Sequence, residues 1–481
     1  MALSTTSRAA DLLHGCVGCA PEGEGWVRPV RFTTAQLRAL GSVRAWHPGL
    51  YKRMAACTAG VCLEFETDAS HVSVEVALGA VPRGTVSTMR DVERHSGSAP
   101  DPGVVSVEID DLPPVAVRPD DRHLVEIDLS EPGADPTDPV ALPGMGRRRR
   151  VRVWLPCLTT CAVRDVFFDG GYLGPVAERR ALLVLGDSIA QGFVADQPAA
   201  TWPALLARRA GLDLVNQGIG GQVFQPGSLW GMEELDPAAI VVEFGENYRY
   251  EPCAASAIGR DVRAYLSEVA SAWPETPTWV LGVPPHTEDV YPTHPRSCFA
   301  EVDGIIADAA GRHSSMTLVD ASTLLDGDRL GELLADGSDH PGPRGQEMIA
   351  ERLAAVMGLG AEKDAGTQPD APSESQEPEA PAEPETPAEP EVPEQSAALA
   401  DAKVAVGAPQ LSIFDLIEDP SAESSVEEPE SAAPEPAAPE PATPVEQPAA
   451  PRPASPKARP KKDERKKHPS SKGRKSRRSR R

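Results

Sequence analysis

A buried strand that ends in a polar turn constrains the fold of this chain more than any other feature. Residues 181–185 are five apolar residues in a row, and Gly186, Asp187 and Ser188 come directly after them. A short apolar run bounded by glycine is typical of a strand buried on both faces. In an α/β fold, a serine at the carboxyl end of such a strand faces the crevice that binds ligands. The tripeptide alone is a weak signal, so its meaning depends on the rest of the chain.

The chain after Ala181 alternates between predicted strands and predicted helices. Thr201 is placed to cap a helix that runs through Arg209, and Gly211 is placed to end it. Further segments continue the same rhythm, with strands expected at 212–215, 239–244, 278–283 and 316–319 and helices around 258–269 and 348–356. This alternation predicts a parallel sheet with helices on both faces.

The chain before Ala181 has a different pattern. Apolar and polar residues alternate in five short segments, at 61–67, 72–76, 104–109, 124–127 and 151–155. Period-two alternation is typical of half-buried strands, and turns rich in Pro, Gly and Asp separate them. Because no helical period lies between these segments, we expect an all-β sandwich of the jelly-roll kind.

The composition changes sharply after residue 361. Residues 362–450 hold 22 acidic against 2 basic residues and many Pro-Glu and Pro-Ala pairs, whereas residues 451–481 hold 15 basic against 2 acidic residues. Segments of this kind bury too little apolar surface to fold. We therefore expect five parts: an N-terminal segment (1–26), a β-sandwich domain (27–176), an α/β domain (177–360), a disordered acidic linker (361–450) and a disordered basic tail (451–481).

The basic tail indicates candidate binding partners, and the N-terminus indicates where in the cell the protein is expected. The basic stretch 457–481 is typical of segments that bind nucleic acid or another anionic polymer by counterion release; a solubilising tail that folds back on the acidic linker is an equal alternative. No run of 18 apolar residues is present, and residues 1–16 lack the apolar core of a secretory signal. We therefore expect a cytoplasmic protein without a membrane span.

Four loops at the predicted sheet edge carry reactive groups. The first strand ends at Ser188, the second runs into the glycine-rich loop 216–221, and the third ends in Gly245-Glu246-Asn247. The chain before the last helix holds Asp336 to Pro341, with His340 among carboxylates. A serine, several N–H donors and a histidine beside carboxylates are the groups that acyl transfer needs.

These four blocks, in this order, resemble the SGNH hydrolase (GDSL esterase/lipase) superfamily over about residues 181–358. The resemblance implies a flavodoxin-like three-layer domain with a five-stranded parallel sheet. It also implies Ser188 as nucleophile, His340 as base, and an oxyanion hole made by the N–H groups of Ser188 and Gly221 with the amide of Asn247. It implies no cofactor. Cys16 and Cys19 have half the spacing of a zinc site but no evident partner pair, so we expect no metal.

The acid of the site departs from the family pattern. The family's acid usually lies three residues before the histidine, and that position is Gly337 here. Asp336 lies four residues before His340 and Asp339 lies one before it. Either the loop bulges so that Asp336, or alternatively Asp339, orients the imidazole, or a backbone carbonyl does so and the site is a dyad. Asp336 is the preferred candidate.

The expected function is hydrolysis of carboxylic esters through an acyl-enzyme intermediate. A β-rich domain directly before the nucleophile strand is similar to the layout of sugar-deacetylating esterases and of acyl-transferring homologues in polyketide pathways. This resemblance implies a small acylated substrate with a short acyl group, first of all acetyl on a sugar. The alternatives are an acyltransferase with the same machinery and a non-catalytic scaffold built on a degenerate hydrolase fold.

Overall fold

The structure of the protein is a computed structural model. It describes residues 5–110, 112–130, 148–249, 254–287 and 299–359. The expected acidic linker and basic tail lie outside the described residues.

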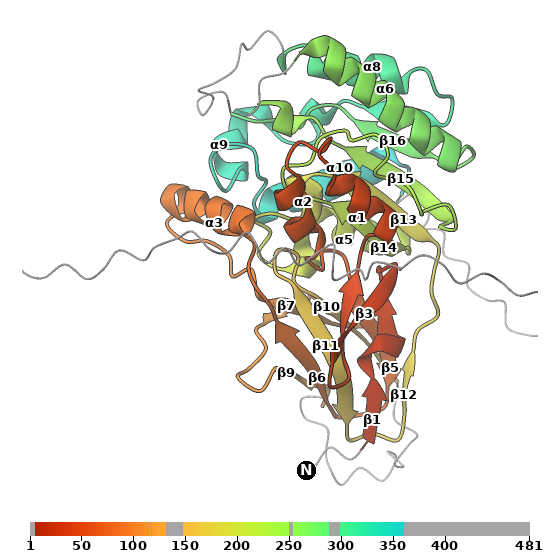
Figure 1. Ribbon diagram of the computed structural model, residues 1–481. Helices are drawn as coiled ribbons and strands as arrows, with labels where there is room; N and C mark the ends of the chain where they lie inside the picture. The colour runs from red at the N-terminus through yellow and green to blue at the C-terminus, as the bar shows by residue number, and fades with distance from the viewer. Residues whose placement is uncertain (1–4, 111, 131–147, 250–253, 288–298, 360–481) are drawn as a thin grey trace, which may run out of the picture. The chain divides into compact units, whose positions relative to one another are not determined.

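The N-terminal region forms two antiparallel sheets of six strands each (Figure 1). In the first, the order is β3 (Gly18–Gly23), β4 (Trp26–Val30), β11 (Cys161–Phe168), β6 (His71–Leu78) and β9 (Leu124–Asp128), with β1 (Thr5–Arg8) also paired to β11. In the second, the order is β12 (Leu173–Pro175), β5 (Cys62–Thr67), β10 (Arg149–Trp154), β7 (Val105–Ile109) and β8 (Val115–Val117), with β2 (Leu13–His14) paired to β5. One cluster of buried side chains from both sheets, including Phe65, Val74 and Val151, forms their core. The predicted sandwich is confirmed.

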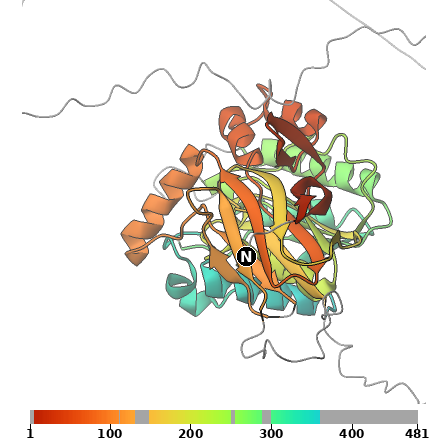
Figure 2. The ribbon, with the colours of Figure 1, turned by 90° about the horizontal axis from the view of Figure 1, so that it is seen from below.

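Three α-helices among the described residues of the N-terminal region contradict the expectation of strands alone. They are α1 (Thr34–Leu40), α2 (Pro48–Ala55) and α3 (Arg83–Ser96), and α3 lies between strands β6 and β7 in the chain. Seen from below, α3 lies to one side of the sandwich strands (Figure 2). Only Thr85 and Val92 of α3 are buried. Its apolar residues, Val86, Met89 and Val92, recur at a helical spacing, but they are few among the polar residues of α3, and the sequence pattern missed them.

The remaining strands form the predicted parallel sheet. Its order is β14 (Asp213–Gly218), β13 (Ala181–Gly186), β15 (Pro237–Glu243), β16 (Thr278–Leu281) and β17 (Met316–Val319). This is the 2-1-3-4-5 order of flavodoxin-like folds. Successive residues of β13 point to opposite faces, so Leu182 and Val184 join one core while Leu183 and Leu185 join another.

Helices cover both faces of the parallel sheet, as predicted. On one face lie α5 (Trp202–Ala210) and α10 (Pro343–Val356), and on the other lie α6 (Ala255–Ala272) and α8 (Val302–Ala310), side by side in Figure 1. Two short helices, α4 (Ser188–Gln191) and α9 (Leu330–Leu333), contribute to the same core as α5 and α10. The side chain of Thr201 caps α5, and Gly211 ends it with a φ of 67°. No helix within the described ranges combines the length and the apolarity that crossing a bilayer requires.

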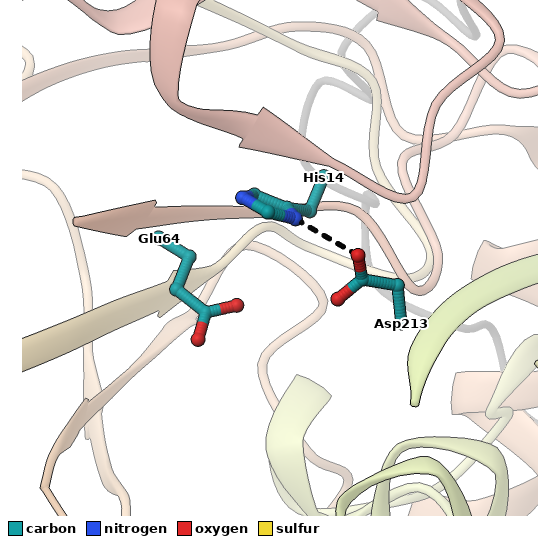
Figure 3. A group of neighbouring side chains, drawn as sticks. All are labelled: His14, Glu64 and Asp213. Carbon is teal, nitrogen blue, oxygen red and sulfur yellow. Dashed lines mark hydrogen bonds and ion pairs between the residues drawn. The ribbon is translucent and has the colours of Figure 1, made fainter. Parts of the chain in front are cut away.

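A buried charged cluster joins the sandwich to the parallel sheet. His14 of β2, Glu64 of β5 and Asp213 of β14 converge, and Nδ1 of His14 lies 3.2 Å from Oδ2 of Asp213 (Figure 3). Arg179 donates to Glu64 at 2.7 Å and Arg152 donates to Glu64 at 2.8 Å. Burial alone would raise the pKa of Glu64, but these two arginines outweigh it and lower the pKa to about 2. Arg179 also forms an ion pair with Asp213, so the cluster links strand β5 of the sandwich to strand β14 of the parallel sheet.

Candidate active site

Ser188 lies where strand β13 gives way to the short helix α4. The side chain of Asp187 caps this helix, because its Oδ1 accepts the N–H of Ile189 at 3.0 Å. A Cβ on Gly186 would lie 2.5 Å from the Cβ of Ala190, so only glycine lets the chain turn this tightly. The turn brings the Ser188 hydroxyl to the surface of a pocket, with the residue 8% exposed.

His340 faces Ser188 across this pocket. Its Nε2 lies 2.9 Å from Oγ of Ser188, a distance at which imidazole can accept the hydroxyl proton. Its Nδ1 lies 2.6 Å from Oδ2 of Asp336 and 2.9 Å from Oδ1 of Asp339. The structure thus brings Ser188, His340 and both candidate aspartates together.

The loop before His340 explains how an aspartate four residues away reaches the imidazole. Oδ1 of Asp336 accepts the N–H groups of Ser338, Asp339 and His340 at 2.9, 3.1 and 3.2 Å, which curls the loop around the carboxylate. Gly337 has a φ of 72°, a conformation that favours glycine. The curl leaves Oδ2 of Asp336 directed at Nδ1 of His340, as the bulged-loop alternative requires.

Asp336 and His340 shift each other's pKa values. Burial alone would raise the pKa of Asp336, but the hydrogen bond and the charge of His340 outweigh it and hold the pKa far below its ordinary value. Burial alone would lower the pKa of His340, but the charges of Asp339 and Asp336 and their hydrogen bonds raise it well above its ordinary value. His340 is therefore a stronger base than a free imidazole.

Two backbone N–H groups are available to a ligand beside Ser188. Within the described part of the chain, the N–H groups of Ser188 and Gly221 have no acceptor. Both residues line the pocket. The loop that carries Gly221 is held by side chains, since Gln191 accepts the N–H of Gly220 at 2.7 Å and Asn216 accepts that of Gly218 at 2.8 Å. A pair of fixed, unused donors next to a serine hydroxyl suits a developing oxyanion.

Asn247, the third predicted oxyanion donor, also lines the pocket but has its amide engaged. It lies in a short 3-10 helix, Glu246–Arg249, after strand β15. Its Nδ2 donates to Oδ2 of Asp187 at 2.8 Å and to the carbonyl of Gln222 at 3.0 Å. Both amide hydrogens are thus directed at acceptors of the chain itself. To donate to an oxyanion, the amide has to share or exchange one of these bonds.

A pair of buried carboxyl groups lies behind Asn247. Asp187 and Glu243 are both buried, and Oε2 of Glu243 lies 3.4 Å from the N–H of Asp187. Burial raises the pKa of Asp187 to about 7, and burial together with the charge of Asp187 raises the pKa of Glu243 well above its ordinary value. Two buried carboxyl groups in contact do not both ionise readily, so this pair retains a proton at neutral pH.

The N-terminal region braces the loop that carries Gly221, through contacts that the sequence did not predict. The guanidinium of the buried Arg31 donates to the carbonyls of Asn216 and Gly218 at 2.9 and 3.0 Å. The hydroxyl of the buried Tyr51 donates to the carbonyl of Gly221 at 3.0 Å. These contacts join positions about 170 residues or more apart, and no local sequence signal links them.

The pocket has a volume of about 600 Å³, and the N-terminal region supplies much of its wall. Leu50 and Met54 of α2 line it together with Phe193, which lies just after α4. Helix α3 lines it with Gly84, Ser87, Thr88, Asp91, Arg94 and His95. The sequence pattern identified none of these residues. The spacing of the α3 residues is that of one helix face, but only the tertiary structure shows what this face meets.

Comparisons with known proteins agree with this architecture. Residues 184–348 match the model of the GDSL-like Lipase/Acylhydrolase family. None of the curated proteins matches the sequence. The salicylyl-acyltransferase SsfX3 from a tetracycline biosynthetic pathway is a similar solved structure, with 21% identity and a TM-score of 0.57 over 74% of this chain and 98% of that one.

Two further solved structures are similar. A putative GDSL-like lipase from Bacteroides ovatus is 16% identical, with a TM-score of 0.53 over 73% of this chain and 96% of that one. A family two carbohydrate esterase from Cellvibrio japonicus is 13% identical, with a TM-score of 0.47 over 74% of this chain and 98% of that one. At such identities, the first two likenesses show a shared fold. Residues 184–348, which follow the β-sandwich in the chain, therefore match the GDSL-like lipase/acylhydrolase family.

Proposed function

We propose that the protein is a serine-dependent carboxylic ester hydrolase that acts through an acyl-enzyme intermediate. The observation that carries the proposal is the continuous contact from Ser188 through His340 to Asp336, at 2.9 and 2.6 Å. Oγ of Ser188 attacks the ester carbonyl carbon while Nε2 of His340 takes its proton. His340 then gives this proton to the leaving alcohol oxygen as the ester C–O bond breaks. In deacylation, Nε2 of His340 takes a proton from water as the water attacks the acyl carbon, and it then returns a proton to Oγ of Ser188 as the acid is released.

The N–H groups of Ser188 and Gly221 support the oxyanion in this mechanism. They lie in the pocket without acceptors among the described residues, so they need no rearrangement when charge develops on the carbonyl oxygen. Asn247 adds a third donor if its amide shares the bond it makes to Asp187. Removing one such donor typically costs about a hundredfold to a thousandfold in kcat.

We further propose that the acyl group is short, acetyl first of all. Esters whose alcohol part is a sugar are the first class to test. The resemblance to sugar-deacetylating esterases supports this choice. Near the oxyanion donors, the side chains of Leu50, Met54 and Phe193 close around Gly220 and Gly221, which suits a small apolar acyl group.

The test compares hydrolysis of p-nitrophenyl acetate by the wild-type protein and by Ser188→Ala. Loss of a nucleophile of this kind lowers kcat by a factor on the order of 10⁶, so the variant is expected at background. Labelling by a fluorophosphonate probe gives an independent readout, because only an activated serine reacts. Folded wild-type protein that neither hydrolyses the ester nor takes the label, beside an esterase control that does both, would support the non-catalytic scaffold instead.

Acyl transfer is the second candidate. The similar structure that carries the name salicylyl-acyltransferase supports it, since the same triad serves both reactions and only the attacking nucleophile differs. Adding alcohols to the p-nitrophenyl acetate assay separates the two. An acyltransferase releases p-nitrophenol faster with a suitable alcohol and forms the new ester, whereas a hydrolase releases acetate.

A further inference from the structure

Helix α3 meets the active site at the loop that carries His340. Oγ of Ser96, the last residue of α3, donates to the carbonyl of Ala335 at 2.6 Å. A Cβ on Gly337 would lie 2.5 Å from Nδ1 of His95, so these two residues are in close contact. The polar face of α3 therefore lies beside the loop that carries His340, the residue that we place as proton donor to the leaving alcohol.

The two sides of the pocket differ in chemistry. Apolar side chains adjoin the oxyanion loop, where a Cβ on Gly220 would lie 3.0 Å from the ring of Phe193 and one on Gly221 3.0 Å from Leu50. The α3 side offers the hydroxyls of Ser87 and Thr88, and beyond them a carboxylate, a guanidinium and an imidazole. The pocket thus has an apolar half and a half rich in hydrogen-bonding groups.

The reaction fixes which half receives which part of the ester. The carbonyl oxygen points to the donors of Ser188 and Gly221, and the leaving oxygen must reach Nε2 of His340 to be protonated. The alcohol therefore extends from His340 toward α3. On that side the charges of Asp91 and Arg94 are paired, because Arg94 donates to Asp91 at 2.7 Å. A face with paired charges and several donors and acceptors suits a neutral, hydroxyl-rich group better than an ion.

We propose that the pocket face of helix α3 is the binding subsite for the alcohol part of the ester, and that this alcohol carries several hydroxyl groups. The inference rests on the proposed ester chemistry and adds the element that selects the substrate. A sugar and a polyhydroxylated aromatic compound share this chemistry, so the test includes one ester of each. A helix of the N-terminal region would then determine the specificity of a reaction carried out by the GDSL-like domain.

The test measures a specificity ratio for full-length protein. The ratio is kcat/KM for methyl 6-O-acetylglucoside, or for pyrogallol monoacetate, divided by kcat/KM for p-nitrophenyl acetate, whose alcohol has no further hydroxyl. Thr88→Val and Asp91→Asn keep the side-chain shape and remove a hydroxyl or a charge. Each is expected to lower the ratio about 3- to 10-fold for the preferred ester, through KM rather than kcat, which is the loss of about one hydrogen bond.

Matched controls lie on the same helix outside the pocket. Arg90→Ala and Glu93→Ala change exposed residues that do not line it, so they are expected to leave the ratio unchanged. The proposal is overturned if Thr88→Val and Asp91→Asn leave the ratio unchanged, or if the controls lower it equally. The ester whose specificity ratio falls more in these two variants shows which kind of alcohol, the sugar or the aromatic compound, the subsite binds.

A binding measurement keeps this inference separate from the proposed function. Calorimetry with Ser188→Ala protein tests binding of methyl glucoside and of pyrogallol without any turnover. Binding that Thr88→Val weakens in the Ser188→Ala background supports the subsite even if no ester is hydrolysed. If the wild-type protein hydrolyses p-nitrophenyl acetate but the Ser188→Ala protein binds neither alcohol, the proposed esterase function stands and the proposed subsite is overturned.

Discussion

The carboxylate of Asp336 lies 2.6 Å from Nδ1 of His340, although Asp336 is one residue further from the histidine than the family pattern places the acid. The position that the pattern expects is Gly337, whose φ is 72° and whose Cβ would collide with His95. An aspartate at this position would adopt an unfavourable positive φ, and its Cβ would displace the ring of His95 on helix α3. The curled loop compensates by presenting Asp336 instead.

Asp336→Asn is expected to lower kcat by roughly a thousandfold or more, because the amide no longer fixes the imidazole and the positive charge on His340 loses its partner. Activity requires neutral His340, so kcat/KM of the wild-type protein rises as pH increases through the raised pKa of His340. Removing a nearby negative charge lowers that pKa. The rising limb of the pH profile is therefore expected to move to lower pH in the variant.

Asp339→Asn is the matched comparison for this assignment. Asp339 also lies near Arg249, with 3.9 Å between Oδ2 and Nη1, so its charge is partly compensated. We expect the same shift of the pH profile but a much smaller loss of kcat. A larger loss in Asp339→Asn than in Asp336→Asn would assign the orienting role to Asp339, and small losses in both would indicate a dyad.

Tyr51→Phe is expected to lower kcat without raising KM. The variant keeps the buried ring and removes only the hydroxyl that donates to the carbonyl of Gly221. Loss of one such hydrogen bond corresponds to roughly a 2- to 10-fold decrease if the bond holds the oxyanion loop in place. Steady-state kinetics with p-nitrophenyl acetate measures the effect, and thermal melting checks the fold. An unchanged kcat in a folded variant would show that the loop keeps its place without Tyr51.

Glu243→Gln is expected to make stability less dependent on pH. In the native state the Asp187–Glu243 pair keeps a proton at pH values where the unfolded chain has lost it. Stability therefore falls as pH rises above the ordinary carboxyl range, by about 1.4 kcal/mol per pH unit for each retained proton. The variant removes one of these groups and offers Asp187 an amide donor instead.

Urea unfolding of wild type and Glu243→Gln at pH 5, 6.5 and 8 measures this effect. The variant is expected to gain stability over the wild-type protein as pH rises. If the free energies of unfolding of the two proteins change with pH in parallel, Glu243 binds no more protons in the native state than in the unfolded state.

Removal of residues 361–481 is expected to leave hydrolysis of p-nitrophenyl acetate unchanged. The last described residue, Leu359, packs against the core around α10, and the cut leaves this residue and the whole of α10 in place. The full chain is expected to bind RNA or polyphosphate with a steep dependence on salt, through the basic stretch 457–481. Removing residues 451–481 alone should abolish that binding. Binding that survives this removal, or that ignores salt, would exclude the tail as the binding segment.

The sequence by itself determined the layers of the fold and the position of the reactive groups along the chain. Strand 181–185 and the alternation after it predicted the parallel sheet, because burial on both faces requires continuous apolar runs. The carboxyl ends of parallel strands share one edge, so Ser188, the loop 216–221 and Asn247 were expected to meet there. These inferences depend on local periodicity and chain order, which a sequence records directly.

Only the tertiary structure showed how Asp336 reaches His340 and which side chains line the pocket. The approach of Asp336 to His340 depends on a loop that curls around the Asp336 carboxylate, and Gly337 of this loop lies against His95, a residue more than 200 positions earlier. The brace from Tyr51 to Gly221 and the polar wall of α3 are likewise contacts between distant segments. Such contacts leave no period in the sequence, because they depend on how two separately patterned regions pack against each other.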